Sequence, residues 1–183
     1  ELGDDESHTV TELLNFVTEF ERIGDYAVNI MEKAEELQEK EASFSENATK
    51  ELQLLENALN RILNLTNDAF ENSDMRLAAQ VEPLEEVIDV MAERLRDQHI
   101  RRLKDGVCSI DTGVVFLDVL NNVERISDHC SNVAVRMIGM EGGEDYDSHT
   151  LKSIMHHNPT KDYMLEYEQC RKEYLVPLEQ MEA

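Results

Sequence analysis

Residues 21–25 read Glu-Arg-Ile-Gly-Asp, and residues 124–128, which lie 103 positions later, read Glu-Arg-Ile-Ser-Asp. The agreement extends beyond these stretches, because Asn29 falls on Asn132 at the same offset. Self-similarity at a fixed offset is the sign of a duplicated structural unit. We therefore expect the two stretches to occupy equivalent positions in two copies of one unit.

The composition favours helices over most of the chain. Only 7 Gly and 3 Pro interrupt 183 residues, and apolar residues recur at steps of three and four, as in the series from Leu52 to Ala69 and from Val81 to Leu95. This pattern predicts an all-α fold, an antiparallel bundle built from two three-helix repeats. We expect helices near 6–41, 45–72, 74–104 and 109–139, and a last helix from about Thr160.

The boundaries of these helices divide the chain into a bundle and a tail. We expect the bundle over residues 1–140, with a partial first repeat at 1–41 and a second repeat at 45–140, and a helical tail at 141–183 that docks on the bundle. Gly106 suits the end of a helix, so its counterpart Gly3 should follow a helix that this chain lacks. Pro83 predicts either a kink or a helix that starts at Glu82.

Charge and cysteine content limit the function. The formal net charge is −23, which disfavours binding to nucleic acid or to an anionic lipid surface, although solubility alone would also explain it. The three cysteines lack metal-type spacing, which fits a reducing cytosol. The apolar run at 114–117 is far shorter than the roughly 20 residues of a membrane span. We expect a cytoplasmic chain that could be a fragment of a longer one.

Each repeated stretch places two carboxylates on one helix face. Glu21 and Asp25, like Glu124 and Asp128, are four positions apart and therefore stack along the helix. Asparagines prolong both lines, with Asn29 in the first copy and with Asn121 and Asn132 in the second. The neighbouring stripe contains small residues that leave room for another helix or an ion; it comprises Val17, Phe20, Gly24, Ala27 and Met31 in the first copy, and Leu120, Val123, Ser127, Cys130 and Ala134 in the second.

A further acidic line, formed by Glu82, Glu85 and Asp89, borders the apolar stripe of the predicted helix 74–104. Two such lines beside a shared core repel each other unless cations or protons neutralise them. A metal held by oxygen ligands would do so, and iron, manganese, magnesium, calcium or zinc are the candidates. The alternative is a set of solvated carboxylates paired with Arg22 or Arg125, but an arginine one position away projects ~100° around the helix.

The motif Glu-Arg-Ile-x-Asp-x-x-x-Asn, present twice in an acidic helical chain, resembles the PhoU family. The resemblance implies paired three-helix bundles with iron or zinc clusters, and a role in regulating phosphate uptake. It assigns metal ligation to six carboxylates: Glu85, Asp89, Glu124, Asp128, Glu21 and Asp25. Residues next to the motif are candidates for contacts that support the ligands: Glu82, Asn121, Asn132, His129 and Asn29.

The stretches 99–108 and 116–118 are similar to the PhoU-like cytosolic tail of bacterial sodium/phosphate cotransporters. This similarity implies a location at the cytosolic face of the membrane and a transporter as partner, either in the same longer chain or as a separate protein. Inorganic phosphate and a second copy of the chain are further candidate partners. The sequence lacks the Glu-x-x-His motif of di-iron oxidases, so we expect no enzyme. A free-standing phosphate regulator and a metal-free helical scaffold remain the alternatives.

Overall fold

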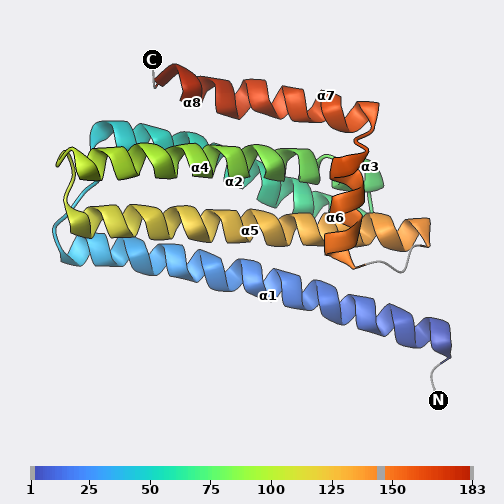
Figure 1. Ribbon diagram of the computed structural model, residues 1–183. Coiled ribbons are helices and arrows are strands. Elements are labelled where there is room, and N and C mark those ends of the chain that lie inside the picture. Colours follow the sequence, from blue (N-terminus) through green and yellow to red (C-terminus); the bar gives the residue numbers. More distant parts are fainter. Residues whose placement is uncertain (1–2, 144–146, 182–183) are drawn as a thin grey trace.

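The computed structural model describes residues 3–143 and 147–181, and within these ranges it contains helices and no strand. Figure 1 shows the arrangement. The all-α expectation is confirmed. The elements in chain order are α1 (Asp4–Glu39), α2 (Glu46–Asn72), α3 (Met75–Ala78), α4 (Val81–Lys104), α5 (Ile110–Gly142), α6 (Ser148–His157), α7 (Lys161–Cys170), the π-helical turn η1 (Arg171–Leu175) and α8 (Val176–Met181).

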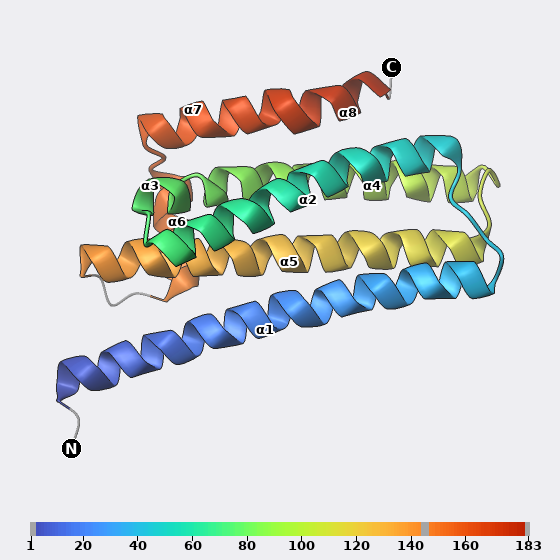
Figure 2. The ribbon, with the colours of Figure 1, turned by 180° about the vertical axis from the view of Figure 1, so that it is seen from behind.

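The long helix α5 lies at the centre of the bundle. It packs against α1 on one side and against α2 and α4 on the other, while α7 and η1 pack on α4. Figures 1 and 2 show the resulting layers, from α1 through α5 to the pair α2 and α4, with α7 and α8 outermost. Most of the largest fully buried side chains come from α2, α4 and α5, and Leu178 of α8 joins them; those of the three long helices include Leu55, Ile62, Leu84, Ile88, Met91, Leu95, Phe116, Leu120 and Ile126.

Helix ends follow the local sequence signals. Ser45 caps α2 by accepting a hydrogen bond from the backbone N–H of Ala48, and Ser109 caps α5 in the same way. Gly106 follows α4 with a φ of 68°, a left-handed conformation that costs glycine little. These are the breaks that the sequence predicted.

Two helix boundaries differ from the expected map. The expected helix 74–104 is divided by a turn at Ala79 and Gln80, and α4 begins at Val81, one residue before the alternative start at Glu82. Pro83 therefore lies in the first turn of α4, where its missing N–H costs no intrahelical hydrogen bond, and no kink is needed. In addition, α6 occupies part of the predicted tail, where its cap is Asp147, which accepts from the N–H of Thr150.

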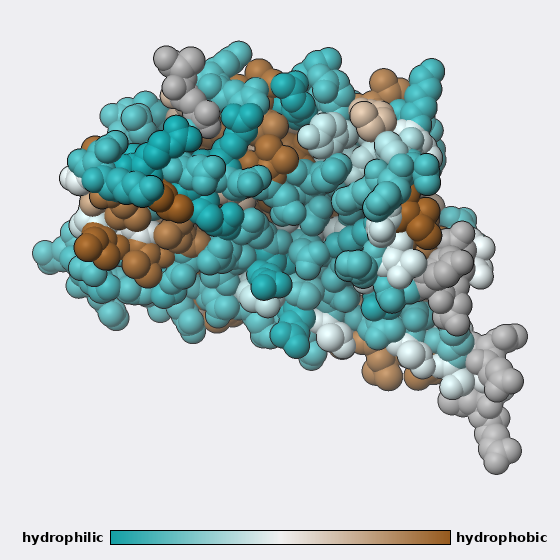
Figure 3. All heavy atoms as spheres, viewed as in Figure 1, coloured by the Kyte–Doolittle hydropathy of each residue, from teal (hydrophilic) through white to brown (hydrophobic). Residues whose placement is uncertain are grey.

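The face of α1 that packs on the bundle differs from the one expected. Phe16 and Phe20 contact Phe70 of α2, with ring centroids 5.2 and 5.0 Å apart. Val17 and Met31 are each 54% exposed, although their counterparts Leu120 and Ala134 are buried. The predicted stripe through Val17 and Met31 is thus wrong as a core face in this chain. Figure 3 shows hydrophobic atoms along the lower edge, where α1 runs.

No helix in residues 3–143 and 147–181 combines the length and the apolar character needed to cross a membrane.

The central position of α5 predicts unequal costs for two leucine truncations. Leu120 is fully buried, whereas Leu14 on α1 is 62% exposed. We expect Leu120→Ala to lower the free energy of unfolding by about 2–5 kcal/mol, because it removes buried contacts and leaves a cavity. Leu14→Ala should change it by less than about 0.5 kcal/mol. Urea titration followed by circular dichroism measures both, and equal losses would contradict the assignment of α5 to the core.

Candidate metal site between α4 and α5

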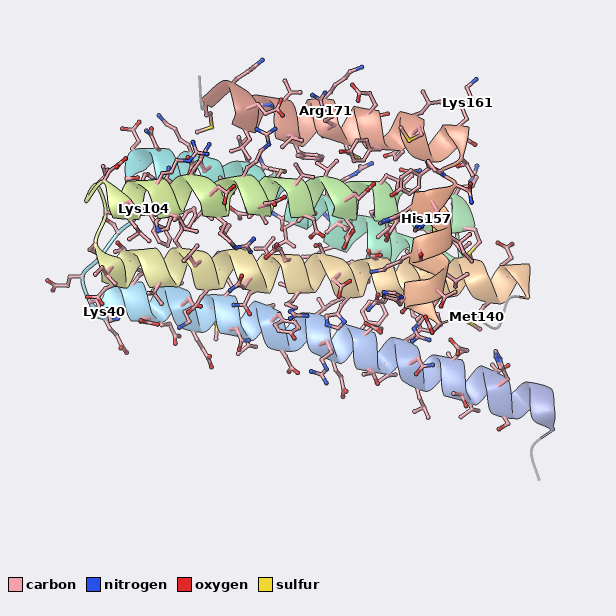
Figure 4. The ribbon with its side chains drawn as sticks, viewed as in Figure 1. Lys40, Lys104, Met140, His157, Lys161 and Arg171 are labelled. Atoms are coloured by element: carbon pink, nitrogen blue, oxygen red, sulfur yellow. The ribbon has the colours of Figure 1, made fainter. Side chains whose placement is uncertain are left out.

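The acidic lines of α4 and α5 face each other across an open groove. Glu85 and Asp89 on α4 line it together with Glu124 and Asp128 on α5, and the cavity volume is about 500 Å³. Figure 4 shows side chains of both helices projecting into the space between them. The structure therefore brings together four of the six carboxylates that the sequence singled out. Asn121 and Arg125 complete the lining.

Glu85 is the most unusual group in this groove. It is only 7% exposed, and among the described residues the hydrogen bonds and ion pairs of the groove go to its neighbours and none goes to Glu85. Burial raises the pKa of this carboxyl to about 9, and the negative charges of Asp89 and Glu82 add to the shift. At neutral pH the metal-free groove therefore holds Glu85 in its protonated form.

Asp89 lies nearer the mouth of the groove and shows a smaller shift. Partial desolvation raises its pKa to about 6, followed by repulsion from Glu124 and Asp128. Both α4 carboxyls thus resist ionisation for the same two reasons, loss of water and excess negative charge. A cation placed between the helices would remove the second cause and replace the lost hydration.

Two basic side chains already neutralise part of the α5 line. Arg96 of α4 pairs with Glu124 and also donates to the Asn121 side chain at 3.1 Å. Lys152 of α6 donates from Nζ to Oδ1 of Asp128 at 2.8 Å. Burial would lower the pKa of Lys152, but the hydrogen bond to Asp128 and the surrounding carboxylates outweigh it, and the pKa is raised.

Glu82 occupies a buried position beyond the groove. Its side chain is 1% exposed, accepts a hydrogen bond from the Ser131 hydroxyl of α5, and lies 2.7 Å from Nε2 of His156 on α6. The sequence placed Glu82 beside the ligands, but it gave no sign of the partner from α6.

The remaining predicted residues lie elsewhere. His129 and Asn132 face α1, where Nδ1 of the histidine is 2.6 Å from Oε2 of Glu19 and the asparagine donates to the same oxygen at 3.1 Å. Asn29 donates to the side chain of Asn122 at 3.2 Å. These contacts join α1 to α5 and are separate from the groove.

Glu21 and Asp25 lie on the exposed face of α1. The structure does not bring them to the four groove carboxylates, because α1 packs on α5 through a different face. The repeated motif therefore has two environments in this chain, one against α4 and one in contact with solvent.

The side chains that line the groove are of the chemical type that binds a hard cation, but their positions do not form a complete ligand set. Oxygen ligands from carboxylates and an asparagine suit iron, manganese, magnesium or calcium. Among the described residues, however, no three His, Cys, Asp or Glu side chains converge closely enough to hold a metal ion. Rotation of the groove side chains, with release of Arg96 or Lys152, would be needed to form a complete ligand set.

Sequence reasoning missed three residues of this site. Arg96 is seven positions after Asp89 and continues the acidic line of α4, so helical periodicity could have found it. Lys152 and His156 belong to the unexpected helix α6, and neither follows the repeat or a known spacing. Only the fold shows that they reach the groove.

The fold and this groove define a class, the all-helical bundles with paired acidic lines on neighbouring helices. Residues 52–137 match the family model of the PhoU domain. The matched segment contains most of α2, all of α3 and α4 and most of α5, and therefore all four groove carboxylates.

Curated proteins of the same name are similar to a longer part of the chain. The chain is 29% identical over 133 residues to the phosphate-specific transport system accessory protein PhoU homolog 1 of Thermotoga maritima, covering 73% of this chain and 56% of the relative. It is 25% identical over 138 residues to the PhoU homolog of Streptococcus pneumoniae, covering 75% and 62%. The chain thus spans about three fifths of the relatives' length. No solved structure matches.

The raised pKa values predict how the stability of the metal-free protein depends on pH. Glu85 titrates near 4.5 when unfolded and near 9 when folded, so the folded state binds more protons between these values. The free energy of unfolding should consequently fall as pH rises through this window. Glu85→Gln should reduce the fall and stabilise the protein near pH 8 by on the order of a few kcal/mol, because one pKa unit corresponds to about 1.4 kcal/mol.

Urea titrations with a chelator present, at pH values near 6 and 8, measure this effect. Glu93→Gln is the matched control, since Glu93 is exposed on the same helix. Identical pH dependence of the wild type and Glu85→Gln would contradict the burial of an uncompensated carboxyl.

Proposed function

We propose that this chain is a metal-binding regulatory domain that acts in phosphate uptake. The observation that carries the proposal is the buried Glu85 carboxyl, which faces three further acidic side chains without a hydrogen-bond donor from the described residues. The relatives' names, which place those proteins with phosphate-specific transport systems, support the phosphate context.

The groove would hold the metal through Glu85 and Asp89 of α4 and Glu124 and Asp128 of α5. Iron or zinc is the proposed ion by family resemblance, and manganese, magnesium or calcium also suit the oxygen donors. The bound ion would supply positive charge and open coordination positions for an anion such as phosphate. The protein's own part is to keep the acidic side chains close together and partly dry, and no catalytic role is assigned to any residue.

The proposed setting is the cytoplasm, with a phosphate transporter as partner. A sodium-dependent transporter at the cytosolic membrane face, in the same longer chain, is the specific form that the sequence similarity favours. A free-standing regulator is the alternative. Neither form requires nucleic acid, which the net charge of −23 disfavours.

We further propose that residues 1–41 are a partial copy of the unit formed by residues 45–140, followed by a tail at 141–183. The 103-residue offset supports this division, as does the outer face of α1, where Val17 and Met31 are exposed at positions that are buried in α5. Glu21 and Asp25 would serve as a second ligand pair only if another helix supplied acidic partners.

Metal binding by purified protein tests the proposal. Elemental analysis of protein prepared without chelator should find bound metal, and calorimetric titration with Mn²⁺ should show saturable binding. Glu85→Gln should weaken Mn²⁺ binding by about tenfold or more, since even contacts outside the direct ligand set change metal affinity by 10–100-fold.

Glu93→Gln removes the same charge from the exposed side of α4 and should bind Mn²⁺ as the wild type does. Absence of metal in the wild type, together with no Mn²⁺ binding, would favour a metal-free scaffold. Equal affinities for wild type and Glu85→Gln would remove the groove as the site.

A further inference from the structure

The helix α6 lies outside the segment that matches the PhoU domain, yet it reaches the groove. In Figure 1 it crosses in front of α5 beside one end of α4, and Figure 4 labels His157 at its C-terminal end. Its contacts are with α5, and through His156 it also reaches α4. A segment beyond the matched region is therefore in position to respond to the state of the groove.

Polar contacts hold α6 in this position. Lys152 donates to Oδ1 of Asp128 at 2.8 Å and also approaches the backbone oxygen of the same residue, and its side chain is 15% exposed. His156 lies 2.7 Å from the buried Glu82. Leu151 is the one residue of α6 that is buried, so apolar packing contributes little to the attachment.

The Lys152 ammonium group neutralises the negative charge of the groove, as a bound metal ion would. It interacts electrostatically with Glu82 and Glu85 as well as with Asp128, and it also acts on Asp89. A metal ion bound through Asp128 would share this carboxylate with Lys152, even if it used the other oxygen, Oδ2. The ion and the ammonium group would then lie close together in a partly dry groove and repel each other, so metal binding weakens the attachment of Lys152.

We propose that Lys152 is a tethered counter-ion that keeps α6 on the metal-free groove, and that metal entry displaces Lys152 and detaches α6. This inference rests on the proposed function and adds how metal binding at that site would change the rest of the protein. The helices α4 and α5 pack closely on each other and should keep their positions when a metal ion binds between them. The helix α6 has a single buried side chain, so it can detach from α5. Metal binding would therefore expose α6 and the surface of α5 that α6 covers.

Hydrogen–deuterium exchange of the full chain tests this directly. Amides of residues 148–157 should exchange faster with saturating Mn²⁺ than with chelator, while amides in the middle of α4 and α5 should keep or increase their protection. NaCl at the same ionic strength, added to the chelated wild type, controls for general salt effects on the exposed helix.

Lys152→Met tests the competition. Because it removes a unit charge from the groove and retains the apolar stem, it should strengthen Mn²⁺ binding by about tenfold or more, and α6 should exchange quickly with or without metal. Lys161→Met is the matched control, since it removes the same charge from the exposed start of α7 and should leave both Mn²⁺ affinity and α6 exchange unchanged.

The outcomes separate this inference from the proposed function. If the wild type binds Mn²⁺ while α6 keeps its protection and Lys152→Met binds no more tightly than Lys161→Met, the counter-ion role is wrong and the metal site stands. If neither wild type nor Lys152→Met binds Mn²⁺, both proposals fail. Exchange measurements on the wild type decide the question even if Lys152→Met folds poorly.

Discussion

The packing of α4 against α5 forces carboxylates of the two helices into proximity. On α4 the core is formed by Leu84 and Ile88, which are 1% and 0% exposed, and the acids at 85 and 89 each follow a core residue by one position. One position corresponds to about 100° around a helix, so these acids lie at the edge of the buried stripe. The acids at 124 and 128 follow Val123 and Ser127 in the same way. Burial of each large apolar side chain, about 1.5–3 kcal/mol, therefore draws the acidic edges together.

Each acid at this edge is accommodated differently, and the differences follow from what lies within reach. Glu124 forms an ion pair with Arg96 of α4, and Asp128 forms one with Lys152 of α6. Glu85 makes no direct ion pair in the described residues, and burial raises its pKa to about 9. The acids of α5 are thus neutralised by Arg96 and Lys152, and Glu85 of α4 is neutralised by a proton. A metal ion would be a third means of neutralisation, and it would compete with the basic side chains and with the proton for the same carboxyl groups.

Sequence reasoning reached the fold and four carboxylates of the site because both depend on periodicity. Heptad-like apolar steps identify the buried stripes of α2, α4 and α5, and the acids adjacent to two of these stripes are then placed at one seam. The same reasoning failed for α6, which is short and polar and is held by Lys152 and His156 through pairings of long sequence separation. The sequence also did not indicate that His129 and Asn132 face Glu19 of α1, because a residue beside a motif faces a different neighbour after each step of about 100°.

The repeated motif shows that the properties of an acidic pair come from the helix packed against it. Residues 21–25 and 124–128 differ at a single position, yet Glu124 and Asp128 line a groove with Glu85, while Glu21 and Asp25 are exposed. Marked rises in pKa fall on Glu85 and Asp89 of the facing helix. The motif supplies the charge, and α4 supplies the burial and the second acidic line that make this charge difficult to accommodate. A cation site therefore requires acidic side chains from two facing helices. In the described residues the motif on α5 faces the acidic side chains of α4, whereas Glu21 and Asp25 of α1 face solvent.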